Sequence, residues 1–456
     1  MIEARKAHDT TVGARALGSW PFAGRVRRRT VVCGAVLLIA SGSAWVLLRP
    51  SSLPAGVLRI VPVADDAIAV DIAVDAQAGR VIMQSGDVTR SGTVSVLDAA
   101  TGRLVRAISI GNFPAAHLVV DARVNHAFVT TATTNFARSG SRATGNMTIV
   151  DTRTGQVIQS SSTGAFPGVG VDPLTGHVFV TSSAGGGTQM LDARDGRLLG
   201  TVAAAGDRIA IDGRTGRTFV VDGQANHISM VDTRTGRVLH VMTAGRAVGV
   251  AVVDERTNRL FVGSPAQWAC GVPGPCRFAS PSRLVVLDTR SGRLVKTLTA
   301  GTDNPAAVAV DARTGRAFVF YTDMTSTEGT LRVLDARTAR VLRRLPVDVA
   351  PDERGVAIDQ RRGRIYAVNN RDGVQVFDAT TGLLIRTIAA PGDAIAVDER
   401  SGHAFIAQRW SPHPSFIDPS RIWSDIQVRL GGRGNPTINT APVHYPGSVA
   451  IIDAAR

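Results

Sequence analysis

The chain has 456 residues, and its 51 basic residues exceed its 37 acidic ones, which gives a formal net charge of +14. Nearly all of the positive charge is arginine, because Lys6 and Lys296 are the only lysines. The arginines are dispersed and no basic stripe with interleaved aromatic residues accompanies them, so the composition argues against nucleic acid as a partner. Length alone permits two or three ordinary domains or one large all-β unit.

The N-terminal segment, residues 1–30, is basic, with seven Arg or Lys residues against two acidic ones. Directly after it, Val31–Leu48 holds 18 residues without a charge, which just reaches the length of a helix that spans a bilayer core. The positive flank places the N-terminus in the cytoplasm. We therefore expect a single-pass signal anchor at residues 31–48 in the cytoplasmic membrane, a linker at residues 49–56, and the remainder of the chain outside the cytoplasm. The alternative is a secreted protein whose signal peptide is cleaved at Ala44.

One pattern repeats from Val57 to the end of the chain. Half-units of the form AVAVDARTGRAFV alternate with half-units of the form LRVLDARTARVLRRL, and together they make eight pairs. In each half-unit, two runs of alternating apolar residues flank a turn, which predicts a β-hairpin. Two hairpins make a four-stranded sheet, and the 323 residues between Asp75 and Asp398 over seven intervals give a repeat of about 46 residues, the size of one propeller blade.

The fold predicted for residues 57–456 is therefore all-β. We expect a single β-propeller of four-stranded antiparallel blades, with eight blades and with seven as the alternative. The last repeat ends at SVAIIDAAR and lacks a fourth strand. That strand is expected at the other end of the chain, since Val57–Asp71 aligns with Leu383–Asp398, where a fourth strand leads into the next blade. An N-terminal strand that completes the last blade would close the ring and cover its open edges.

The hexapeptide DARTGR, Asp311–Arg316, recurs in related forms along the repeats. Four residues after the Asp, Gly stands in twelve of fifteen comparable half-units, and Asn125, Asn258 and Ala339 stand in the others. Gly with Asn as its substitute indicates a positive φ, and an Asp that accepts from N–H groups two and three residues on completes a type I turn. So many copies point to architecture rather than to catalysis. At Ala339 we expect strain of about 1 kcal/mol, so that Ala339→Gly should stabilise the protein.

Cys270 and Cys276 enclose the loop CGVPGPC. In an exported protein, a cysteine pair across a Pro/Gly loop predicts a disulfide. A metal site is the weaker interpretation, because no further Cys or His lies nearby at ligand spacing. We therefore predict no metal site at this loop.

Every Asp-to-Gly turn joins strands 1 and 2 or strands 3 and 4 of a blade, so these turns should share one face of the propeller. The irregular length falls between strands 2 and 3, on the opposite face, in the insertions Thr131–Asn146, Ser264–Ser282, Tyr321–Gly329 and Arg409–Gly447. Insertions on one rim are the usual place for recognition, although their aromatic residues could instead only anchor long loops. The candidates for contacts at this rim are Trp268, Trp410, His413, Trp423, His444 and Tyr445.

The connections from strand 4 to strand 1 of the next blade lie on the same face and enter the central channel. They carry polar residues that the repeat does not explain. The candidates for ligand binding at this channel mouth are His117, Arg208, Arg246, Asn304, Glu353, Arg354 and Asp393. Arginines among carboxylates can hold an anionic ligand or a metal ion, and the alternative is a set of mutually paired, hydrated charges.

Several strands resemble those of a known family. They read FVTT at Phe128–Thr131, FVTS at Phe179–Ser182 and YAVNN at Tyr366–Asn370. With partner strands such as VSVLDAATGRLV, they make the chain similar to the YVTN-repeat (YncE-like) β-propellers, which are exported or membrane-anchored, over nearly all of residues 57–456. The resemblance implies the fold, but propellers of this shape serve as binding platforms, lyases, lactonases and electron-transfer partners. Many members have seven blades, so the count of eight departs from the commonest pattern.

The sequence contains no G-x-S-x-G, H-E-x-x-H, P-loop or haem-attachment motif. We therefore expect a membrane-tethered, extracytoplasmic scaffold that binds a protein or a small ligand through its insertion-bearing face, as a monomer and without a cofactor. The alternative is a lactonase- or lyase-like enzyme with its site at the channel mouth, which could use a divalent metal.

Overall fold

The computed structural model describes residues 53–64, 68–86, 91–112, 115–135, 142–183, 186–243, 248–270, 276–323, 329–348, 351, 354–369, 371–408 and 447–453. The chain divides into the units Met1–Ser51 and Ser52–Arg456, and all described residues belong to the second. The predicted basic segment and membrane anchor lie outside the described residues. Across the described part of the chain, no helix is long and apolar enough to cross a membrane.

The first four blades are four-stranded antiparallel sheets whose strands follow one another along the chain. Blade 1 consists of β2 (Ile68–Asp75), β3 (Arg80–Gly86), β4 (Ser91–Asp98) and β5 (Leu104–Asn112). Blade 2 consists of β6 (Ala115–Asp121), β7 (His126–Asn135), β8 (Arg142–Asp151) and β9 (Val157–Thr163). Blade 3 consists of β10 (Val169–Asp172), β11 (His177–Val180), β12 (Thr188–Asp192) and β13 (Leu198–Val202). Blade 4 consists of β14 (Arg208–Asp212), β15 (Arg217–Asp222), β16 (His227–Asp232) and β17 (Val238–Thr243).

The other four blades have the same order, with one insertion and one exchange of strands. Blade 5 consists of β18 (Val250–Asp254), β19 (Arg259–Ser264), β22 (Arg283–Asp288) and β23 (Leu294–Thr299), and the hairpin of β20 (Gln267–Cys270) and β21 (Cys276–Ser280) is inserted in it. Blade 6 consists of β24 (Asp303–Asp311), β25 (Arg316–Asp323), β26 (Gly329–Asp335) and β27 (Val341–Val347). Blade 7 consists of β28 (Val356–Asp359), β29 (Arg364–Asn369), β30 (Gly373–Asp378) and β31 (Leu384–Ile388). Blade 8 consists of β32 (Ala394–Asp398), β33 (His403–Gln408), β34 (Gly447–Asp453) and β1 (Val57–Ala64).

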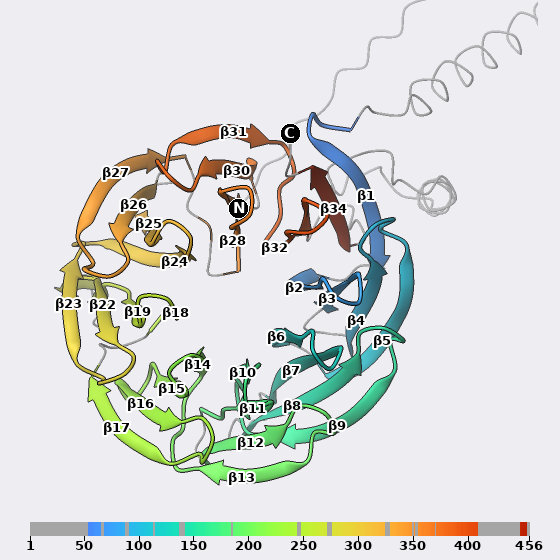
Figure 1. The fold of residues 1–456 in the computed structure, drawn as a ribbon, viewed down its shortest axis with the longest axis horizontal. Helices are drawn as coiled ribbons and strands as arrows, with labels where there is room; N and C mark the ends of the chain where they lie inside the picture. Colours follow the sequence, from blue (N-terminus) through green and yellow to red (C-terminus); the bar gives the residue numbers. More distant parts are fainter. Residues whose placement is uncertain are drawn as a thin grey trace, which may run out of the picture. The chain divides into compact units, whose positions relative to one another are not determined.

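The blades form a closed ring around a central channel, with the first strand of each blade innermost (Figure 1). The ring closes where β1, from the start of the repeats, pairs antiparallel with β34, so that Ile60 lies opposite Ala450. The prediction of eight four-stranded blades and of an N-terminal strand that completes the last one is therefore confirmed. Among the described strands, each blade has its full set of four, so the pairing of β1 closes the seam where the two ends of the repeat array meet.

The core lies between the blades. The described residues form eight apolar clusters, one at each junction between neighbouring blades. In seven blades the second strand contributes a fully buried aromatic residue at the same repeat position: Phe128, Phe179, Phe219, Phe261, Phe318, Tyr366 and Phe405. A lone blade would expose these rings, so the repeat is stable only as part of the ring.

The turns have the predicted geometry. All twelve glycines of the motif have a positive φ, and so do Asn125, Asn258 and Ala339, the last at 54°. Within DARTGR, Asp311 Oδ1 accepts a hydrogen bond from the N–H of Arg313 at 2.9 Å, two residues on. The motif therefore closes hairpins, as its pattern indicates.

The same motif also joins neighbouring blades, which the sequence pattern did not reveal. Arg313 Nε donates to Gln360 O in the next blade at 3.2 Å, and Arg400 Nη1 donates to Ala76 O across the ring closure at 2.8 Å. The buried Asp75 carboxylate accepts from the Thr152 hydroxyl of the next blade at 2.6 Å. The acid and the arginine of the motif therefore contribute to the ring as well as to each hairpin.

Candidate functional site

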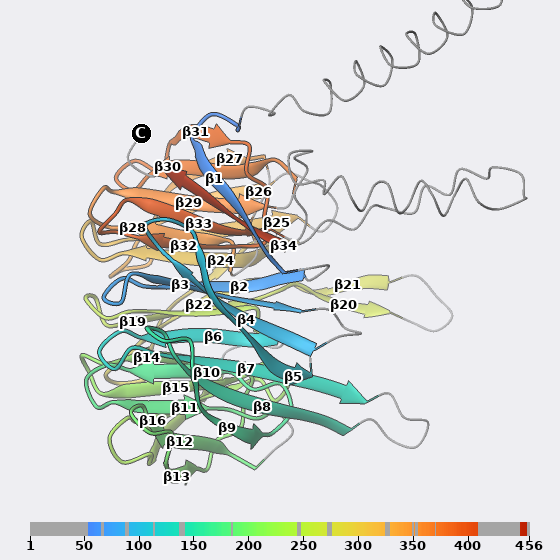
Figure 2. The same cartoon turned by 90° about the vertical axis from the view of Figure 1, so that its right-hand side faces the viewer.

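The two faces of the propeller differ (Figure 2). One face carries the Asp-to-Gly turns, such as Asp311–Gly315, and we call it the turn face. The opposite face carries the connections from strand 2 to strand 3 and from each blade to the next, and we call it the loop face. The hairpin of β20 and β21 projects from blade 5 on the loop face.

The base of this hairpin is fixed to the next blade. The N–H of Ala266 donates to Asn304 Oδ1 at 2.6 Å, and both residues are buried. On the returning side, the buried Ser282 donates its hydroxyl to Asp303 O at 2.5 Å and its N–H to Gly301 O at 2.9 Å. Buried hydrogen bonds are costly to break, so the hairpin leaves the propeller in a defined position.

An aromatic pair stands on the projecting hairpin. Trp268 and Phe278 lie opposite each other across the two strands, with ring centroids 5.6 Å apart and planes at 75°. Both are exposed, Trp268 to 38% and Phe278 to 47%. An edge-to-face pair of this kind adds about 0.5–1.5 kcal/mol beyond its buried area, so the contact favours one arrangement of the two rings on the surface.

Cys270 lies opposite Cys276 in the same two-stranded ladder. This register brings the two backbones together at the end of the hairpin, as a disulfide between them would require. Their side chains lie outside the described residues, so the disulfide stays a prediction.

A third exposed aromatic residue, Phe166, lies in the connection from β9 to β10. Its φ is 47°, a left-handed conformation that is unusual for a bulky side chain, and it is 45% exposed. The neighbouring backbone is held in place, because Ala165 O accepts from Ser183 N at 2.9 Å and Pro167 O accepts from the Thr130 hydroxyl at 3.0 Å. The fold thus maintains a strained connection that presents an aromatic ring on the loop face.

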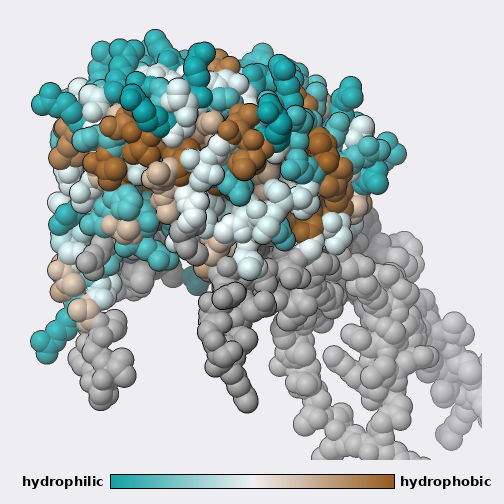
Figure 3. Space-filling model, turned by 90° about the horizontal axis from the view of Figure 1, so that it is seen from below, coloured by the Kyte–Doolittle hydropathy of each residue, from teal (hydrophilic) through white to brown (hydrophobic). Residues whose placement is uncertain are grey.

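The exposed apolar residues of the described chain fall into two groups. The aromatic ones, Phe166, Trp268 and Phe278, all lie on the loop face. The others are aliphatic, and most lie on the outermost strands, as Val241 and Leu294 do, where Figure 3 shows apolar patches among hydrophilic side chains along the wall of the propeller. Within the described residues, exposed aromatic side chains are thus confined to one face.

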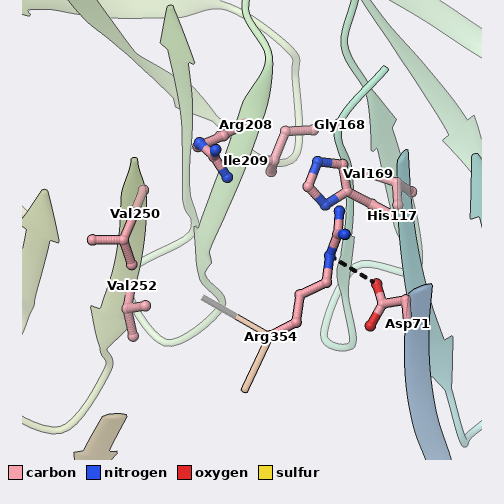
Figure 4. A pocket seen from close by; sticks show the side chains of 10 residues that line it. Asp71, His117, Gly168, Val169, Arg208, Ile209, Val250, Val252 and Arg354 are labelled. Atoms are coloured by element: carbon pink, nitrogen blue, oxygen red, sulfur yellow. Dashed lines mark ion pairs between the residues drawn. The ribbon is translucent and has the colours of Figure 1, made fainter. Parts of the chain in front are cut away.

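The central channel holds a pocket of about 200 Å³ (Figure 4). Its walls come from the innermost strands of several blades, from Gly168 directly before β10, and from Arg354 shortly before β28. The lining residues are Asp71, His117, Gly168, Val169, Arg208, Ile209, Val250, Ala251, Val252 and Arg354. Three of the predicted channel-mouth residues, His117, Arg208 and Arg354, therefore meet in one cavity.

Asp71 organises one side of this pocket. Its carboxylate accepts hydrogen bonds from Ile72 N at 2.9 Å and from Leu118 N of the next blade at 3.1 Å, and it pairs with Arg354 Nε at 3.7 Å. Across the pocket, Arg208 Nε donates to Val248 O at 3.2 Å. These contacts orient two guanidinium groups toward the cavity from different blades.

The other predicted channel residues have different positions. Asn304 supports the hairpin base through Ala266 and does not line the pocket. Asp393 is half-buried before β32 and donates its N–H to Ala407 O at 2.9 Å. Arg246 and Glu353 lie outside the described residues.

Of the predicted rim residues, the structure describes Trp268. The remaining ones, in the long insertion of blade 8, lie outside the described residues: Trp410, His413, Trp423, His444 and Tyr445. Within the part of the chain that the structure describes, no group of three or more His, Cys, Asp or Glu side chains is placed to hold a metal ion.

Sequence reasoning missed Asp71 and Phe166. Asp71 interrupts the apolar alternation of β2 at a register shift, and this break in the pattern was the available signal. Phe166 gave no such signal, because nothing in GAFPG fixes which residue takes a positive φ.

Beside Arg208, burial raises the pKa of Asp207, while the Arg208 guanidinium opposes this shift. The channel wall therefore also holds a partly desolvated acid.

A family model described as outer membrane protein assembly factor BamB matches residues 143–404, more than half of the chain. The chain belongs to this BamB family. The family match and the eight-bladed ring together support a β-propeller protein. No curated protein matches the sequence.

Solved structures share the fold of this BamB-family chain. The computationally designed Ika8 protein is 15% identical with a TM-score of 0.55, over 76% of this chain and 95% of that one. Hydrazine synthase from Kuenenia stuttgartiensis is 13% identical with a TM-score of 0.50, over 73% of this chain and 98% of that one. At such low identity these similarities show the propeller fold alone.

Proposed function

We propose that the protein is a membrane-tethered, extracytoplasmic scaffold that binds a protein partner through its loop face. The observation that carries this proposal is the Trp268–Phe278 pair on a projecting hairpin with a buried, hydrogen-bonded base. Large aromatic residues dominate binding energy in protein interfaces. A fixed hairpin loses little conformational entropy when it binds, which increases affinity.

Membership of a family described as an assembly factor supports a protein partner rather than a substrate. The confinement of exposed aromatic residues, within the described chain, to the loop face supports that face as the site of contact. The YVTN-like strands and the uncharged run at residues 31–48 support an exported protein with a membrane anchor.

The point where the chain enters the propeller fits a tether. β1 begins beside the turn face, where Gly56 O accepts from Asp453 N at 3.1 Å. Gly56, the last residue of the predicted linker, therefore lies at the turn face, opposite the face that carries the aromatic hairpin.

Site-specific photo-crosslinking tests the proposal. A photoreactive amino acid at Trp268 in the full chain, expressed in its cell envelope, should give a discrete adduct with one protein. The control position is Leu174 on the turn face, which is 71% exposed and should give none. The Asn304→Ala variant, which removes the acceptor for Ala266 N, should weaken the adduct at position 268 although the photoreactive residue and Phe278 are the same as in the parent experiment. Equal adducts from both positions, or none from Trp268, would contradict the proposal.

A further inference from the structure

The central pocket combines two kinds of wall. Arg208, Arg354 and His117 bring two guanidinium groups and an imidazole to it, with Asp71 as the one carboxylate among the described lining residues. On the other side Figure 4 shows Val250 and Val252 across the pocket from His117 and Asp71. The cavity therefore has a basic part and an apolar part.

The basic part matches an oxyanion. A guanidinium presents a planar set of N–H donors that suits carboxylate and phosphate oxygens. Arg354 comes from blade 7 and Arg208 from blade 4, and a polar contact orients each of them, with Asp71 for Arg354 and with Val248 O for Arg208. Arginines that line one cleft with low-dielectric walls attract an anion more strongly than dispersed surface arginines do.

The apolar part and the volume narrow the ligand class. Val169, Ile209, Val250 and Val252 pack into the apolar clusters between blades, and the edges of these clusters that line the pocket carry no charged group, so they suit a short hydrocarbon body. The volume of about 200 Å³ lies below the roughly 300 Å³ at which pockets for drug-sized ligands begin. A phosphate ion would use only the basic part, whereas a short carboxylate uses both.

We propose that the central channel binds a small organic carboxylate with a short apolar body. The carboxylate lies between Arg208 and Arg354 with His117 beside it, and the apolar body lies against Val250 and Val252. This inference does not depend on the proposed scaffold function, because the pocket lies in the channel and the aromatic hairpin projects from blade 5.

Ligand-detected NMR and calorimetry on the full chain in detergent test the pocket with defined probes. Benzoate and 3-methylbutanoate should bind, and benzamide, which has the same shape as benzoate without its charge, should bind at least tenfold more weakly. Pyrene-1-carboxylate should not bind, because it exceeds the cavity. Inorganic phosphate should bind more weakly than benzoate, since it leaves the apolar wall unused.

Substitutions locate the binding. Arg208→Gln should weaken benzoate binding at least tenfold, whereas Arg214→Gln, an exposed arginine in the turn of the same blade, should not change it. Because Arg354→Gln also removes the partner of Asp71 and could disturb folding, Arg354→Lys serves as the second variant and should weaken binding while it keeps the charge.

Three outcomes would overturn the proposal. In the first, no carboxylate binds, as expected if the guanidinium charges are neutralised within the protein. In the second, phosphate or benzamide binds as well as benzoate. In the third, the Arg208→Gln and Arg354→Lys variants fold and bind benzoate like the parent protein.

Discussion

At the scale of single residues, the repeated turn sets a strict conformational demand. Its fourth position after the Asp has a positive φ wherever the motif is described, whether Gly, Asn or Ala occupies it. This geometry was predictable from sequence, because Gly and Asn are the residues that adopt a positive φ at the lowest cost. The contacts from Arg313 and Asp75 to neighbouring blades were not predictable, since they depend on how the blades pack.

Substitution of two turn glycines should separate backbone strain from steric conflict. Around Gly216 a Cβ would meet no atom within 4 Å, so Gly216→Ala should cost about 1 kcal/mol of unfolding free energy. At Gly102 a Cβ would lie 2.7 Å from Ile451 Cδ1, so Gly102→Ala should cost clearly more. Denaturant titration of both variants measures their unfolding free energies. Equal losses of unfolding free energy would show that contacts of the added Cβ with neighbouring atoms do not contribute to the cost.

Ala339→Gly should change stability less than the turn geometry alone suggests. Its φ of 54° implies strain, but its methyl group is fully buried in the cluster between blades 5 and 6. Relief of the backbone strain should stabilise the protein by about 1 kcal/mol. Loss of the buried methyl group should destabilise it by about 0.8 kcal/mol, which nearly offsets this gain. The expectation of a clear stabilisation is thus revised to a change near zero, and a shift of the unfolding midpoint that corresponds to about 1 kcal/mol or more in either direction would contradict this balance.

Acid should weaken the outer turns. The Thr338 hydroxyl, which donates to Asp335 at 2.8 Å, lowers the pKa of that carboxyl, and burial opposes the shift. A carboxyl with a lowered pKa in the folded state stabilises it above the ordinary pKa of about 3.9 and loses this effect as pH falls through the folded value. Thr338→Val should therefore raise the pKa of Asp335 in an NMR titration and reduce the loss of stability below a pH of about 4. An unchanged pKa would exclude the hydroxyl as the cause.

At the scale of elements, β1 closes the ring and also completes a core. Its Ile60 is buried with Ile452 and Val376 in the cluster between blades 7 and 8, whereas Leu58 on the same strand is 48% exposed. The position of this strand was predictable because Val57–Asp71 has the pattern of a fourth strand that leads into a first one. The β20–β21 hairpin was not, since its sequence has no alternation that marks strands.

Two substitutions on β1 should have unequal effects. Ile60→Ala should destabilise the propeller by about 2–3 kcal/mol, because it opens a cavity in a sealed junction. Leu58→Ala should cost about 0.5 kcal/mol or less. Thermal unfolding of both variants provides the comparison. Similar losses of stability would mean that β1 stabilises the ring by strand pairing and not by side-chain packing.

At the scale of the whole molecule, the repeat builds a symmetric ring and the departures from it mark where function can lie. The blade count and the closure followed from the sequence because the repeat is regular. The channel pocket could be predicted from the sequence only in part. His117, Arg208 and Arg354 were correct candidates, whereas Asp71 was missed and Asn304 supports the hairpin instead. Which polar side chains of the repeats meet in the channel depends on the register of each strand. A shift of one residue moves a side chain to the other face of its sheet.

The aromatic hairpin on the loop face is the surface that we propose binds a protein partner. The most direct measurement is the affinity of the crosslinked partner for the full chain and for the variants Trp268→Ala, Phe278→Ala and Leu174→Ala. The two aromatic variants should bind at least tenfold more weakly, as expected when an interface loses a central aromatic residue, and the Leu174 variant should bind like the parent protein. Unchanged affinity in both aromatic variants, or a loss confined to the Leu174 variant, would contradict a binding role for this hairpin.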